Sequence, residues 1–72
     1  MSKQEEEMIK TFIRIREEQG ISQRQLAALT GIKQPAIARF ESGRAIPQIA
    51  TMKKLLEPLG YTLAISQITD NS

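Results

Sequence analysis

The sequence predicts an all-α fold, a compact domain of four to five helices that ends in a short C-terminal β-strand. The chain has 72 residues, which is enough for one domain. Hydrophobic residues make up 40% of the chain, but the aromatic ones are one Tyr and two Phe, so the core must be built from Leu, Ile and Ala. These residues recur at helical spacing, and Gly or Pro interrupts them at short intervals.

The first helix is expected to begin after Ser2 and to stop at Gly20. Ser2 and Glu5 have the spacing of a capping box, and acidic residues in the first turn suit the positive end of the helix dipole. The face that should meet the core contains Ile9, Phe12, Ile13 and Arg16. One charged side chain therefore lies on an otherwise apolar stripe.

Two short helices should follow. Ser22 and Gln25 repeat the capping-box spacing, and Gly31 ends the helix that they begin. The next helix is expected at residues 33–42. Its Pro35 is tolerated because the N–H groups of a first turn have no intrahelical acceptor.

A fourth helix is expected at residues 48–59, before Gly60. Beyond it, apolar residues alternate with polar or small ones, which is the periodicity of a strand. A lone strand leaves its backbone groups unpaired, so we expect two copies of the chain to pair as an antiparallel, twofold dimer. The predicted dimerisation residues are Tyr61, Thr62, Leu63, Ala64 and Ile65.

The spacing across the two short helices indicates a helix-turn-helix at residues 22–42. Counting from Gln23, Ala27 lies four residues on, where the helices press close, and Gly31 lies eight residues on, at the turn. Glycine suits that turn because it adopts a positive φ without a Cβ clash. The residues expected to fill the wedge between the helices are Leu26, Ile32, Ile37 and Phe40.

The chain is thereby expected to divide into three parts. Residues 1–60 form the helix-turn-helix domain, and residues 61–68 form the dimerisation strand. Residues 69–72, which follow the last apolar position, are expected to be a flexible tail.

The segment ISQRQLAALTGIKQPAIARFESGRAIP resembles the Xre family, the phage Cro and cI repressor type of helix-turn-helix. The similarity covers residues 8–60 and implies a lambda-repressor-like domain whose third helix is the recognition helix. It also implies a sequence-specific transcriptional repressor that binds double-stranded DNA as a homodimer on a palindromic operator. A structural ion pair between Arg16 and Glu41, linking the first and third helices, is implied by the same resemblance.

The outward face of the predicted recognition helix suits base readout. Gln pairs with adenine, Arg pairs with guanine, and Ala contacts the thymine methyl group. The expected base-readout residues are Lys33, Gln34, Ala36 and Arg39. The family has Ser or Thr in the first turn, where this chain has Pro35 and Ala36, so Gln34 and Arg39 are expected to carry more of the discrimination. The resemblance also implies phosphate contacts by Gln23, Arg24, Ser42 and Arg44.

The charge distribution fits a polyanionic partner. The net charge is only +2, but residues 19–56 contain six basic residues against a single acidic one, Glu41. Five of the eight acidic residues precede this zone, at positions 5–7 and 17–18. A basic zone in the middle of the chain is the electrostatic footprint of a nucleic-acid-binding protein.

The composition argues against other classes of protein. Cys and His are both absent, so disulfides, zinc fingers, thiol catalysis and an imidazole base are excluded, and neither an enzyme nor a cofactor or metal is expected. The sequence has no signal-peptide pattern and no apolar run of the roughly 20 residues that would span a membrane. A cytoplasmic protein without a membrane partner is expected.

The helices followed by GYTLAIS resemble the HigA-type antitoxins of the Xre family. That resemblance implies an autoregulating antitoxin whose partner is a small RelE/HigB-like toxin. A stand-alone phage-like or controller-type repressor is the first alternative. A protein-interaction adaptor that keeps the helix-turn-helix only as a scaffold is an alternative from another class, and it would show neither a preferred DNA site nor salt-dependent DNA binding.

Overall fold

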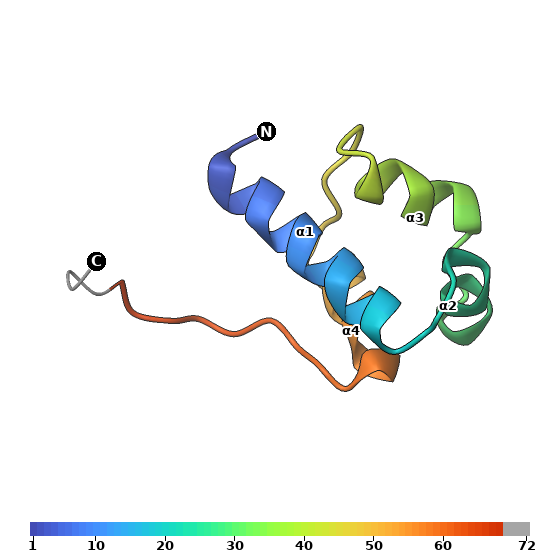
Figure 1. Cartoon of the computed structure of the whole chain (residues 1–72). Coiled ribbons are helices and arrows are strands. Elements are labelled where there is room, and N and C mark those ends of the chain that lie inside the picture. Colours follow the sequence, from blue (N-terminus) through green and yellow to red (C-terminus); the bar gives the residue numbers. More distant parts are fainter. Residues whose placement is uncertain (69–72) are drawn as a thin grey trace.

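The computed structural model describes residues 1–68 and is all-helical (Figure 1). The α-helices are α1 (Lys3–Glu18), α2 (Gln23–Thr30), α3 (Gln34–Glu41) and α4 (Ile49–Leu56), and a 3₁₀ helix, η1 (Glu57–Leu59), continues α4. Helices α2 and α3 pack against each other, α1 contacts α3, and α4 and η1 contact α2. The predicted all-α class is confirmed. The predicted flexible tail at residues 69–72 lies outside the described residues.

Both predicted capping boxes form. The Ser2 hydroxyl accepts the Glu5 amide at 3.1 Å, and the Glu5 carboxylate accepts the Ser2 amide at 2.8 Å. At the start of α2, Ser22 and Gln25 exchange the same two bonds at 3.0 and 2.7 Å. The hydrogen bond from the Ser2 backbone amide lowers the pKa of Glu5. Local sequence therefore defines where α1 and α2 begin.

The turn between α2 and α3 satisfies its own backbone groups. Gly31 has a φ of +77°, and its amide donates to the Ala27 carbonyl at 2.8 Å. The buried Thr30 hydroxyl donates to the Leu26 carbonyl at 2.8 Å and accepts the Ile32 amide at 3.2 Å. The chain can therefore reverse tightly beside the core without leaving a buried donor unpaired.

The core joins all the helices. Its central side chains include Leu26, Ile37 and Leu55, which come from α2, α3 and α4 and are fully buried. The full set of buried apolar residues is Ile9, Phe12, Ile15, Leu26, Ile37, Met52, Leu55, Leu56 and Leu59, with Met8, Ile13, Ile21, Ala27, Ile32, Phe40 and Leu63 half-buried against it. The predicted wedge residues are all in this set. Burial of Ile37 fixes which side of α3 faces outward.

The fourth helix is shorter than predicted. We expected an α-helix over residues 48–59, but α4 ends at Leu56 and the chain continues as η1. Pro58 has no backbone N–H to donate to the α-helical ladder, so the last turn tightens to 3₁₀. Gly60, with a φ of +85°, then ends the helical region. The Tyr61 amide closes it with a hydrogen bond to the Leu56 carbonyl at 3.1 Å.

The predicted C-terminal strand does not form within the single chain. Residues 61–68 leave the helices as an extended segment (Figure 1), and the described residues contain no second strand to pair with it. Leu63 packs against the core, but Tyr61 is 51% exposed and Ile65 fully exposed. Without a neighbouring strand, nothing holds this segment flat on the helix.

Two leucines of α2 provide a matched test of this core. Leu26→Ala should lower the free energy of unfolding by about 2–5 kcal/mol, because it leaves a cavity among fully buried side chains. Leu29, in the same helix, is 60% exposed. Leu29→Ala should therefore change the stability by about 0.5 kcal/mol or less. Urea denaturation followed by circular dichroism measures both, and equal losses would contradict this description of the core.

Candidate nucleic-acid interface

Helix α3 turns one face to the core and the other to solvent. Ile37 is fully buried on the inner face. Lys33, the N-cap of α3, makes no side-chain capping bond, and its side chain is exposed. Gln34 and Arg39 are exposed as well, whereas Ala36 is half-buried. Three of the four predicted base-readout residues therefore have freely accessible side chains, and Ala36 lies at the edge of the exposed face.

The predicted phosphate contacts lie on two segments beside α3. Arg24 is exposed near the start of α2, and Ser42 and Arg44 are exposed in the loop after α3. This loop is anchored on one atom, because the Arg39 carbonyl accepts both the Ser42 hydroxyl and the Arg44 amide at 3.0 Å. The residues that follow α3 are thus held at a defined place relative to the helix.

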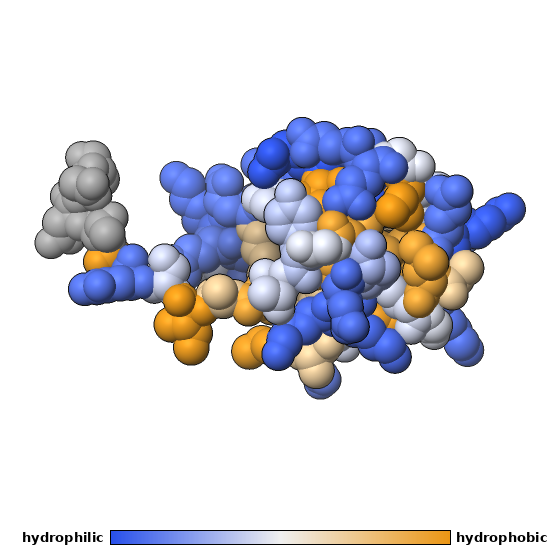
Figure 2. Space-filling view, turned by 90° about the horizontal axis from the view of Figure 1, so that it is seen from below, coloured by the Kyte–Doolittle hydropathy of each residue, from blue (hydrophilic) through white to orange (hydrophobic). Residues whose placement is uncertain are grey.

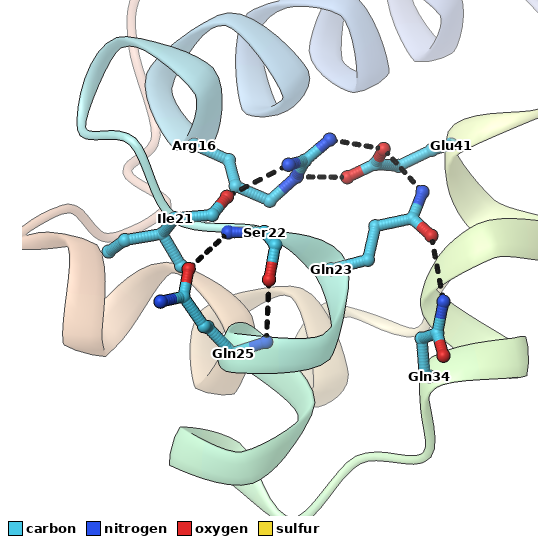
Figure 3. Close-up of polar contacts among 7 residues, drawn as sticks. All are labelled: Arg16, Ile21, Ser22, Gln23, Gln25, Gln34 and Glu41. Carbon is cyan, nitrogen blue, oxygen red and sulfur yellow. Dashed lines mark hydrogen bonds and ion pairs between the residues drawn. The ribbon is translucent and has the colours of Figure 1, made fainter.

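A nearly buried ion pair joins α1 to α3 (Figure 3). Arg16 donates from Nε to Oε2 of Glu41 at 2.7 Å and from Nη2 to Oε1 at 2.8 Å, while Nη1 donates to the Ile21 carbonyl at 2.8 Å. The two side chains are only 10% and 8% exposed. The hydrogen bonds to Glu41 raise the pKa of Arg16 above its ordinary value. Both charges are therefore compensated at a site that excludes most water.

Gln23 extends this ion pair to the exposed face of α3. Its Nε2 donates to Oε1 of Glu41 at 2.9 Å, which leaves its Oε1 facing Nε2 of Gln34 at 3.5 Å (Figure 3). The carboxylate can only accept, so the N–H end of the Gln23 amide faces Glu41 and the oxygen end faces Gln34. From the sequence, Gln23 is predicted only as a phosphate contact. Its link to Glu41 was missed, because no local pattern connects two residues 18 positions apart.

The basic side chains around α3 have no nearby carboxylate to oppose them. Arg16 already pairs with Glu41, the single acidic residue of the basic zone. Within residues 1–68, the other ion pair joins Arg14 to Glu18 on α1. The basic residues of α2, α3 and the following loop are Arg24, Lys33, Arg39 and Arg44. This surface consequently favours a polyanion.

Two short helices that meet at a tight glycine turn, the second with a basic outer face, define a helix-turn-helix protein. The profile described as helix-turn-helix matches residues 13–65, and the chain belongs to this family. The predicted resemblance to Xre-type proteins is thereby confirmed.

Two curated relatives are similar over most of this chain. An uncharacterized HTH-type transcriptional regulator of Haemophilus influenzae is 55% identical over 58 residues, which is 81% of this chain and 59% of that protein. The HTH-type transcriptional regulator PuuR of Escherichia coli is 40% identical over 55 residues, which is 76% of this chain and 30% of PuuR. The chain thus spans less than two thirds of either relative.

A solved structure shares the fold. A chain of a toxin–antitoxin module from Streptococcus pneumoniae superimposes with a TM-score of 0.73 at 40% sequence identity. The match covers 94% of this chain and 83% of that one.

The structure also bears on metal binding and on membrane spanning. In the part of the chain that it describes, no group of three or more His, Cys, Asp or Glu side chains could hold a metal ion. No helix of residues 1–68 is long and apolar enough to cross a membrane.

The ion pair can be tested against a surface pair of the same chain. Glu41→Ala should lower the free energy of unfolding by about 3–5 kcal/mol, because it leaves Arg16 charged, nearly buried and unpaired. Glu18 pairs with Arg14 at 3.8 Å, and both side chains are 63% exposed. Glu18→Ala should cost about 0.5 kcal/mol or less. Chemical denaturation compares the two variants, and a loss for Glu41→Ala no larger than that for Glu18→Ala would show that the buried pair is dispensable for stability.

Proposed function

We propose that the protein is a transcriptional repressor that binds double-stranded DNA sequence-specifically, with α3 in the major groove. One observation carries this proposal. Ile37 is buried, whereas Lys33 at the N-cap and Gln34 and Arg39 in the second helix of a helix-turn-helix are exposed. Relatives named HTH-type transcriptional regulators support it.

The base contacts follow from the orientation of the side chains. Gln23 accepts one N–H of the Gln34 amide, so a second N–H and Oε1 stay available to a ligand. This donor and acceptor match N7 and N6 of adenine in the major groove. Arg39 suits the two acceptors of guanine, and Lys33 suits either of them. Ala36, being half-buried, contributes a small apolar contact with a thymine methyl group.

The phosphate contacts would set the position of α3 in the groove. Arg24, Ser42 and Arg44 are exposed beside the helix, and Gln23 lies at the first position of α2. Such contacts determine register and orientation, but they carry no sequence information by themselves.

The operator is expected to be palindromic, because we propose that the protein acts as a homodimer. Residues 1–60 would bind the DNA, and residues 61–68 would join two copies through Tyr61, Thr62, Leu63, Ala64 and Ile65. A twofold dimer places its two recognition helices about 34 Å apart, which matches half-sites one helical turn apart.

We further propose that the repressor is the antitoxin of a toxin–antitoxin pair and controls its own operon. The similarity to a chain of the pneumococcal toxin–antitoxin module supports this role, because it extends over nearly all of the present chain. The partner would be a small RelE/HigB-like toxin. A stand-alone repressor would share the DNA interface but lack this partner, so co-purification with the product of the adjacent gene separates the two.

The DNA-binding proposal is tested with the DNA upstream of the protein's own gene. Fluorescence anisotropy across a salt series should give one preferred site. The logarithm of the binding constant should fall with a slope of about −0.9 per phosphate neutralised. Arg44→Ala should reduce the magnitude of this slope by about 1 on every sequence. Binding that shows neither site preference nor salt dependence would favour the adaptor hypothesis instead.

Arg39 gives the sharpest test of base readout. Arg39→Ala should weaken operator binding by about 1–3 kcal/mol and relax the preference at one base pair, because one bidentate contact is lost. Arg14→Ala is the matched control, since Arg14 is exposed on α1, outside the basic zone of residues 19–56. Competition with cognate and random DNA measures both effects. An equal loss on the two DNAs would make Arg39 a phosphate contact.

A further inference from the structure

The segment that follows η1 combines uncovered apolar side chains with unpaired backbone. Tyr61 is 51% exposed, and Ile65 is fully exposed. On the neighbouring helix α4, Ile49 is 73% exposed. A shallow pocket lies between them, lined by Ile49, Lys53 and residues 63–65. Figure 2 shows apolar atoms along the extended segment, where it leaves the helices.

One hydrogen bond of this segment determines which of its residues can take hydrogen-bonded positions in a β-ladder. The Tyr61 amide is already bonded to the Leu56 carbonyl at 3.1 Å, so it is not free to join a β-ladder. In an antiparallel ladder, residues alternate between hydrogen-bonded and non-hydrogen-bonded pairs. Tyr61 must therefore take a non-hydrogen-bonded position, together with Leu63 and Ile65. The hydrogen-bonded positions fall on Thr62 and Ala64.

This alternation of hydrogen-bonded and non-hydrogen-bonded positions restricts how two copies can pair. Two residues that face each other in the ladder are either both at hydrogen-bonded positions or both at non-hydrogen-bonded positions. A twofold axis that passed between two neighbouring residues, such as Leu63 and Ala64, would make each of them face the other's copy. It would therefore set a hydrogen-bonded position against a non-hydrogen-bonded one. Only an axis that passes through a residue pair is compatible. Axes through Leu63, Ala64 and Ile65 all satisfy this condition.

We infer that two copies of the chain form a two-stranded antiparallel ribbon whose twofold axis passes through Leu63. Each Tyr61 then faces Ile65 of the partner subunit, and the two Leu63 side chains face each other. An axis at Ala64 would set Tyr61 opposite Gln67 of the partner subunit instead. The Leu63 axis thus sets apolar side chains against apolar ones at all the non-hydrogen-bonded positions, Tyr61, Leu63 and Ile65.

The surroundings of residues 61–68 are suited to binding a second copy of the chain. Residues 61–68 contain no charged side chain, so two copies can approach without like-charge repulsion. Leu63 packs on the core, whereas Tyr61 and Ile65, which belong to the same set of alternate positions, remain uncovered in the single chain. We place the partner strand on the α4 side, over the pocket at Ile49. There it would cover apolar surface that is open to solvent in the single chain.

This inference rests on the proposed homodimer, and it specifies the register and the hydrogen-bonded residues of that interface. It does not depend on DNA binding or on the antitoxin role. The experiment can therefore separate a wrong register from a wrong function.

Single-cysteine variants of the full chain test the register, and the natural chain has no Cys to interfere. Under mild oxidation, Leu63→Cys should form a disulfide-linked dimer about tenfold or more faster than Ala64→Cys or Ile65→Cys, because only residues at the axis meet their own copy within disulfide distance. Faster linkage at Ala64→Cys or Ile65→Cys would overturn the proposed axis. Equal rates at all three positions would overturn the ribbon.

A second measurement covers the case in which Leu63→Cys disturbs the packing of Leu63 on the core. Mixing Tyr61→Cys with Ile65→Cys should give the mixed disulfide about tenfold or more faster than either variant links to itself. No preference for the mixed product would also overturn the ribbon. Light scattering of the unmodified chain reports the dimer independently. A dimer that fails both cross-linking tests would leave the proposed function standing without this interface.

Discussion

The arrangement of the whole interface depends on the Glu41 carboxylate. It neutralises Arg16 of α1, and through Gln23 it also orients an amide at the start of α2. One acidic group thereby links three helices at the point where α3 must present its outer face. Because the pair is almost buried, removing either partner would leave a desolvated charge. Apolar packing by Ile37 sets which way α3 faces, and the polar network sets how its side chains are aligned.

Much of the fold could be predicted because its determinants are local. Ser22 and Gln25 define the start of α2 through bonds across three residues, and Gly31 ends the helix with a conformation that suits glycine. The strand predicted at residues 61–68 could not be settled in the same way. Its sequence alternates as a strand does, but a ladder needs a neighbour, and the described part of the chain provides none. Ile15, a buried residue of α1, was absent from the predicted stripe because that stripe was drawn too narrowly.

In the candidate site too, the features set by local sequence could be predicted and those set by tertiary packing could not. Arg39 could be selected from the sequence, because helical periodicity places it opposite Ile37, and Gln34 was expected at the flank of the same exposed face. Lys33 lies just before the helix, at its N-cap. The partial burial of Ala36 and the bond from Gln23 to Glu41 depend on how closely α2 and α3 approach, which spacing does not specify. Amide orientation is a tertiary property. It decides which hydrogen-bonding groups Gln34 offers to a base, so the chemistry of readout is less predictable than its location.

The Arg39 carbonyl has a further consequence. It holds both the Ser42 hydroxyl and the Arg44 amide, so the arginine proposed to recognise a base and the residues proposed to grip the sugar–phosphate chain share one anchor. Depth of insertion and placement along the duplex are then mechanically coupled. A shift of the protein by one base pair would displace both sets of contacts together. Misaligned complexes would accordingly lose affinity abruptly, without passing through a series of partly satisfied intermediates.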